Sequence, residues 1–168
     1  MEPIELTGPA LRVAIAKDVL KGLKAMKLIT TRGNWVRIPY EFGFTSNLHA
    51  SNEPPEEELA EVLNGKTCEV CALGALFVET VKRCEKLKCD RKTSCASIEL
   101  ISEYLKPIFS NDQLRMIEIA YECGLGQFDP NCSTELRAKE FGQERETNDG
   151  RMIAIMENII KNNGEFIP

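Results

Sequence analysis

The chain has 168 residues, of which 43% are hydrophobic and 28% charged, and its formal net charge is −5 at neutral pH. This composition is typical of a folded globular protein and excludes wholesale disorder, while the acidic balance argues against a nucleic-acid partner, which needs clustered Lys and Arg. No apolar run approaches the roughly 20 residues of a membrane span, so we expect no membrane partner.

The N-terminal half of the sequence predicts two helices and one extended segment. Aliphatic residues at helical spacing from Leu11 to Met26 predict a first helix, which Thr7–Pro9 starts and which ends near Leu28, before residues 30–33. Alternating apolar residues over 36–40 predict a short extended segment, which Pro39 restricts to a sheet edge. An acidic helix is expected over 56–63.

The remainder of the sequence predicts further helices. A central helix is expected from Cys68 to about Lys86, with Thr67 as its cap. Later helices are expected around Ile98–Ile108, after the capping box at Ser110–Gln113, over residues 135–141, and from an Asn148–Asp149 cap to Asn163–Gly164. The fold expected is mostly α: one domain over residues 1–168, built as an irregular helical bundle of about six helices with at most a short extended edge segment.

The stretch from Cys68 to Phe77, CEVCALGALF, places two cysteines at the start of the predicted central helix. Unpaired N–H groups and the positive dipole end at such a position stabilise a thiolate and lower its pKa, so Cys68 and Cys71 are candidate nucleophiles. A thiol nucleophile needs a base, for which the only histidine, His49, is the candidate. The alternative is that both cysteines are small buried core residues.

The same two cysteines are candidate metal ligands. Cys68-x-x-Cys71 forms one zinc-type pair, and Cys84, Cys89 and Cys95 offer further thiols. The later spacings do not make a second regular pair, so no cofactor is favoured and zinc is kept as the alternative.

Gly74 interrupts the predicted central helix, where glycine costs about 1 kcal/mol relative to alanine. Ala72 and Ala75 lie beside it, so this row of the helix carries little side-chain bulk. We expect the row to allow close approach of a neighbouring backbone or of a ligand.

The start of the last helix carries the candidate ligand-binding residues Asn148, Asp149 and Arg151. A cation in a first helical turn is poorly placed against the helix dipole, which indicates that Arg151 has a partner such as a carboxylate or an anionic ligand. The alternative is an exposed arginine of little consequence.

The pattern of Cys68, Val70, Cys71, Ala72, Gly74 and Ala75, followed by Asn148 and Asp149, resembles an uncharacterised family of small proteins found mostly in bacteriophage, plasmid and bacterial genomes. Arg151 falls one residue early for the family's loose Asn-Asp-x-x-Arg spacing. The resemblance implies an accessory protein of a phage or mobile element, and it implies no established activity.

The functional hypothesis is a non-enzymatic protein that binds a host protein, such as a defence component, or a small anionic ligand. The N-terminal residues lack the layout of a signal peptide, which favours the bacterial cytosol and reduced cysteines. The alternatives are a cysteine-dependent enzyme and a zinc-stabilised interaction module. The sequence leaves the partner's identity and the oligomeric state open.

Overall fold

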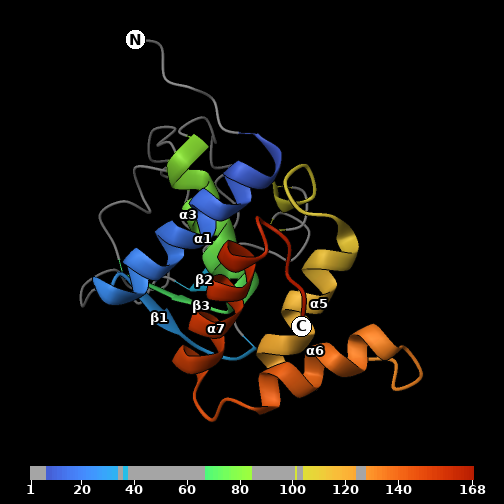
Figure 1. Ribbon diagram of the computed structural model, residues 1–168. Coiled ribbons are helices and arrows are strands. Elements are labelled where there is room, and N and C mark those ends of the chain that lie inside the picture. The colour runs from blue at the N-terminus through green and yellow to red at the C-terminus, as the bar shows by residue number, and fades with distance from the viewer. Residues whose placement is uncertain (1–6, 34–35, 38–66, 85–100, 102–103, 124–127) are drawn as a thin grey trace, which may run out of the picture.

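The computed structural model describes residues 7–33, 36–37, 67–84, 101, 104–123 and 128–168 (Figure 1). Their elements are α1 (Gly8–Lys24), β1 (Leu28–Thr30), β2 (Val36–Arg37), β3 (Cys68–Val70), α3 (Ala72–Cys84), α5 (Asn111–Glu122), α6 (Ser133–Gln143) and α7 (Asn148–Lys161). Helices dominate, which confirms the mostly α class. The predicted helix over 56–63 and much of the one over 98–108 lie outside the described residues, so the count of about six stays a prediction.

The described part of the chain contains a three-stranded sheet in the order β1-β3-β2, which the sequence analysis did not predict. Strand β3 lies in the middle, parallel to β1 with Leu28 opposite Cys68, and antiparallel to β2 with Val36 opposite Val70. These four side chains are buried. The expected extended segment at 36–40 is therefore an edge strand in its described residues, but the expectation of at most one such segment was wrong.

Strand β1 exists because the first helix ends earlier than its aliphatic spacing predicts. Helix α1 ends at Lys24, and Met26 adopts a left-handed conformation with φ of 55°, which turns the chain. The N–H of Lys27 donates to the oxygen of Gly22 at 2.9 Å and closes this turn. The next residues include β-branched Ile29 and Thr30, which suit an extended backbone. The predicted helix end at Leu28 is therefore wrong: the helix ends at Lys24, the chain turns, and Leu28 begins a strand.

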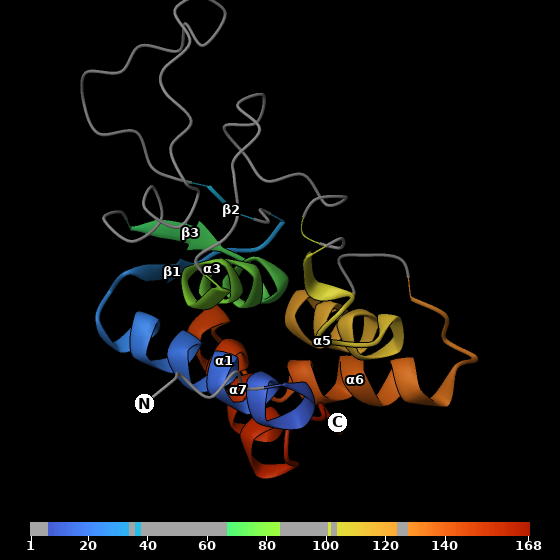
Figure 2. The same cartoon turned by 90° about the horizontal axis from the view of Figure 1, so that it is seen from above.

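The helices pack on one another beside the sheet (Figures 1 and 2). Helix α3 contacts β2 and β3, α1 contacts both α3 and α7, and α5 pairs with α6. The α5–α6 contact is close at Gly142, where an added Cβ would lie 1.8 Å from the main-chain oxygen of Ala120. Only a residue without a side chain permits this approach. Helix α5 also contacts α3 and α7.

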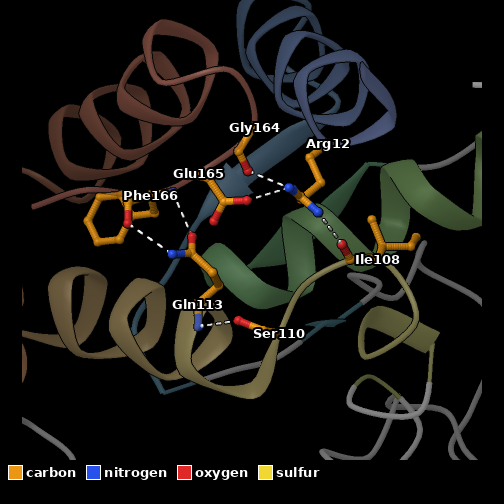
Figure 3. Close-up of polar contacts among 7 residues, drawn as sticks. All are labelled: Arg12, Ile108, Ser110, Gln113, Gly164, Glu165 and Phe166. Atoms are coloured by element: carbon orange, nitrogen blue, oxygen red, sulfur yellow. Dashed lines mark hydrogen bonds and ion pairs between the residues drawn. The ribbon is translucent and has the colours of Figure 1, made fainter. Parts of the chain in front are cut away.

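The C-terminal residues are fixed by polar side chains of α1 and α5 (Figure 3). The guanidinium of Arg12 donates to the oxygen of Gly164 at 2.7 Å and to the oxygen of Ile108 at 3.0 Å, and it pairs with Glu165. Gln113 exchanges two hydrogen bonds with the main chain of Phe166, which is fully buried. These contacts tie the two ends of the described chain into one core.

Several helix ends agree with the sequence. The side chain of Ser110 caps α5 by accepting from the N–H of Gln113 at 3.2 Å, as the capping box predicts. The last helix ends before Gly164, whose φ of 93° makes the predicted stop. None of the helices in the described ranges is long and apolar enough to span a bilayer.

Candidate functional site

Cys71 lies at the point where the central strand turns into a helix. It follows β3 and precedes α3, so it occupies the position that caps the helix, and its Sγ accepts from the N–H of Gly74 at 3.5 Å. The side chain is only 5% exposed. Burial raises the pKa of Cys71 to about 12, and the negative charges of Glu122 and Glu118 act in the same direction.

The expected helix-start thiolate is therefore wrong in two respects. Cys68 lies in β3 and is fully buried, because the helix begins at Ala72 and Thr67 is not its cap. Cys71 does lie at a helix start, but desolvation outweighs the helix N–H groups and keeps its thiol neutral. Both side chains are thiols within the core, as the alternative of small buried core residues predicts.

Gly74 lies in α3 and is buried, as the sequence analysis expects. Ala72 and Ala75 beside it are also buried. The part of α3 with little side-chain bulk therefore faces the interior.

The start of α7 is held by polar contacts to β1 and to its own preceding turn. Thr147 is the cap, accepting from the N–H of Gly150 at 3.0 Å, which corrects the predicted cap at Asn148 or Asp149. The carboxylate of Asp149 instead accepts a hydrogen bond from the hydroxyl of Thr30. Strand β1 and helix α7 are thus joined side chain to side chain.

Arg151 is buried, being only 5% exposed, so the reading of an inconsequential surface arginine was wrong. One terminal nitrogen donates to the oxygen of Arg145 at 2.8 Å, and the other donates to the side-chain oxygen of Asn148. Within the described part of the chain, its Nε has no hydrogen-bond partner. A buried donor left without a hydrogen bond lowers stability by about 1–3 kcal/mol. A ligand atom that accepts from this Nε would recover that free energy on binding.

Tyr121, in the last turn of α5, connects the two regions. Its hydroxyl donates to the main-chain oxygen of Thr31 at 2.9 Å. Burial raises the pKa of Tyr121, the negative charge of a Cys71 thiolate would raise it further, and the positive charge of Arg151 lowers it. Tyr121 therefore lies within electrostatic reach of both Cys71 and Arg151.

Glu122, the next residue of α5, contacts the segment after β1. Its carboxylate accepts from the N–H of Gly33 at 3.4 Å and is attracted by both Arg32 and Arg151. Burial nevertheless raises its pKa. Two more shielded atoms in this segment, Thr31 Oγ1 and Arg32 Nε, lack a hydrogen-bond partner among the described residues.

These residues form one candidate site, which we name the β1–α7 junction: Thr30, Thr31, Arg32, Cys71, Tyr121, Glu122, Asp149 and Arg151. It lies where the parallel strands β1 and β3 end, an edge at which ligands commonly bind in parallel sheets.

Of the residues predicted from the sequence, the junction contains Cys71, Asp149 and Arg151. Asn148 supports it through Arg151, whereas Cys68 lies at the opposite end of its strand. His49, Cys89 and Cys95 lie outside the described residues, so the base and the second pair of zinc ligands remain predictions. Among the residues that the structure does describe, no group of three or more His, Cys, Asp and Glu side chains is placed to hold a metal ion.

Sequence reasoning missed the other five residues of the junction: Thr30, Thr31, Arg32, Tyr121 and Glu122. The first two were assigned to a turn, because β1 was not predicted. Tyr121 is buried in α5, and nothing in the sequence indicates the contact that its hydroxyl makes. No local pattern in the sequence marks these residues as neighbours of Arg151.

Comparison with known proteins finds no family model, no curated protein and no solved structure that matches this chain.

Proposed function

We propose that the chain is a non-enzymatic binding protein whose β1–α7 junction holds a small anionic ligand. The observation that carries this proposal is a set of three unpartnered hydrogen-bonding atoms in the described structure: Thr31 Oγ1, Arg32 Nε and Arg151 Nε. All three can donate, and the oxygens of a carboxylate or phosphate accept such bonds strongly. Their residues all lie around Tyr121 and Glu122.

The charges at the junction support a small anion bound mainly by hydrogen bonds. The carboxylates of Asp149 and Glu122 already accept from Thr30 and Gly33, and the guanidinium groups of Arg32 and Arg151 attract the carboxylate of Glu122. An incoming anion therefore gains charge-assisted hydrogen bonds without a large net field. Arg32 is only partly buried, so part of its side chain is exposed to solvent at the junction.

The resemblance to phage and plasmid proteins supports an accessory role in a bacterial cytosol. The residues that carry that resemblance include Cys71 and Gly74 on one side and Asn148 and Asp149 on the other. Thr30 links these segments, since its hydroxyl donates to Asp149 and its backbone is paired with Val70, the residue before Cys71. A ligand site at this link accounts for why the two separated motifs would occur together.

The cysteine-dependent enzyme is the weaker proposal. A nucleophile must reach its thiolate form, and the burial of Cys71 opposes ionisation. Cys68 is fully buried within the sheet.

Calorimetric titration tests the proposal with three probes: inorganic phosphate, succinate and adenosine monophosphate. We expect at least one to bind with a micromolar Kd, and Arg32→Gln to weaken that binding about tenfold. The matched control is Arg137→Gln, an exposed arginine on α6, which should bind as the parent does. The proposal is wrong if no probe binds, or if Arg32→Gln binds unchanged. If no anion binds and a pull-down retains a host protein, the result would favour a protein partner over a small anionic ligand.

A further inference from the structure

A pocket of about 140 Å³ lies beside α3 and α5, apart from the donors of the β1–α7 junction. It is lined by Leu73, Ile101, Leu105, Asn111, Leu114, Arg115 and Glu118. The aliphatic residues come from α3, α5 and the helical residues near 105, while the polar residues all come from α5. A space of this size holds a short alkyl chain with one polar group and is too small for a drug-sized ligand.

Glu118 is the negatively charged residue of the lining. It is partly buried, and among the described residues its carboxylate makes no hydrogen bond and no ion pair. Arg115 attracts it electrostatically, and Glu122 repels it. A carboxylate in these surroundings is short of solvation and gains from a donor that enters the pocket.

Arg115 attracts Glu118, but the ion pair of its guanidinium among the described residues is with a carboxylate of another helix. Its Nε lies 3.2 Å from Oε1 of Glu135, and its Nη2 lies 3.4 Å from Oε2 of the same carboxylate. Glu135 belongs to α6, so this pair helps to fasten α6 to α5. Glu135 therefore offsets part of the charge of Arg115 outside the pocket, and within the lining Arg115 also attracts Glu118.

We propose that this pocket binds an aliphatic ammonium group. The hydrocarbon part would pack against Leu73, Leu105 and Leu114, and the ammonium would donate to the carboxylate of Glu118. Asn111 offers a side-chain oxygen for a second ammonium proton. Two sources carry this chemistry, namely a free short-chain amine and the lysine side chain of a partner. This site is independent of the anion proposed at the junction.

Calorimetry of the full chain with n-butylammonium tests the proposal, with n-butanol as the uncharged probe. We expect n-butylammonium to bind and n-butanol to bind much more weakly, and we expect Glu118→Gln to weaken n-butylammonium binding about tenfold. The matched control is Asp112→Asn, which removes an exposed carboxylate from the same helix outside the pocket and should leave binding unchanged. Circular dichroism verifies that both variants are folded.

Equal binding of n-butylammonium to the parent and to Glu118→Gln would overturn the proposal, as would no binding at all. An equal loss in Asp112→Asn would also overturn it, because the effect would then come from overall charge. The source is distinguished by comparing free n-butylammonium with a lysine flanked by blocked peptide bonds. Tighter binding of the peptide supports a partner's side chain, and tighter binding of the free amine supports a small metabolite.

Discussion

The hydroxyl of Tyr121 donates a hydrogen bond to the main-chain oxygen of Thr31 at 2.9 Å, and this contact joins the end of α5 to the end of β1. It positions the segment that carries Thr31 and Arg32 against the start of α7. The β1–α7 junction depends on it, because two of the three unpartnered atoms proposed to bind an anion belong to that segment.

Replacing Tyr121 by Phe removes this hydrogen bond and keeps the buried ring. We expect Tyr121→Phe to lower the free energy of unfolding by about 1–2 kcal/mol, since the oxygen of Thr31 loses its partner. Urea denaturation measures the change. Tyr104→Phe is the control, because the described residues offer no hydrogen-bond partner to that hydroxyl, and it should be nearly neutral. Equal stability of parent and Tyr121→Phe would show that the contact does not form in solution.

The contacts of Arg12 with the C-terminal residues give a second prediction about stability. Arg12→Met removes hydrogen bonds to Gly164 and Ile108 together with the ion pair to Glu165. We expect a loss of about 2–3 kcal/mol in the free energy of unfolding, because two buried or partly buried carbonyls lose a charged donor. Arg137→Met, an exposed arginine on α6, should change stability by less than about 0.5 kcal/mol. A similar small effect from both substitutions would contradict the role of Arg12.

The cysteines should differ in their rate of alkylation. Cys132 occupies the N-cap position of α6 and is partly exposed, and its hydrogen bond with the hydroxyl of Thr134 lowers its pKa. Burial raises the pKa of Cys71 to about 12. We expect iodoacetamide at neutral pH to modify Cys132 more than about tenfold faster than Cys71, as measured by peptide mass spectrometry. Rapid labelling of Cys71 in the folded protein would contradict this prediction and would support the hypothesis of a cysteine-dependent enzyme.

Glu118 gives a prediction for the pH dependence of stability. Burial raises its pKa in the folded state, so the folded protein binds this proton more tightly than the unfolded chain does. Its contribution to stability is therefore fully present below the unfolded pKa of about 4.3 and is lost as pH rises through the folded pKa. Glu118→Gln should increase stability at neutral pH relative to the parent and flatten this decline. Thermal melts from pH 4 to 7 test it, with Asp112→Asn as the control. A steeper decline in Glu118→Gln would contradict the burial of this carboxylate.

Local patterns predicted the helices well and the sheet poorly. Ser110 and Gln113 form a cap within four residues, so the sequence shows it directly. Strands β1 and β3 are only three residues long, and Leu28 pairs with Cys68 across forty positions. Such pairing has no local signature, and the apolar residues of CEV fit a helix face as readily as a strand. The cysteines were placed on a helix for this reason.

The candidate site was predicted in part. Cys71, Asp149 and Arg151 were identified from helix-end chemistry. Arg151 is hydrogen-bonded, but its partners are the main-chain oxygen of Arg145 and the side-chain oxygen of Asn148, not the carboxylate or anionic ligand that its position in the first turn indicated. Thr31 and Tyr121 escaped prediction because their roles depend on tertiary contacts made by a main-chain oxygen and a side-chain hydroxyl. The thiolate was wrong because the sequence shows the helix dipole but not the depth of burial that opposes it.

The most direct test of the central claim is a ¹⁵N-labelled NMR titration of the full chain with whichever of phosphate, succinate and adenosine monophosphate binds most tightly. A ligand at the β1–α7 junction predicts that the largest amide shifts fall on Thr31–Gly33, on Tyr121–Glu122 and on Asn148–Arg151, with little change on the exposed residues of α6. Shifts confined to residues outside these three segments, or no saturable shift, would contradict the account.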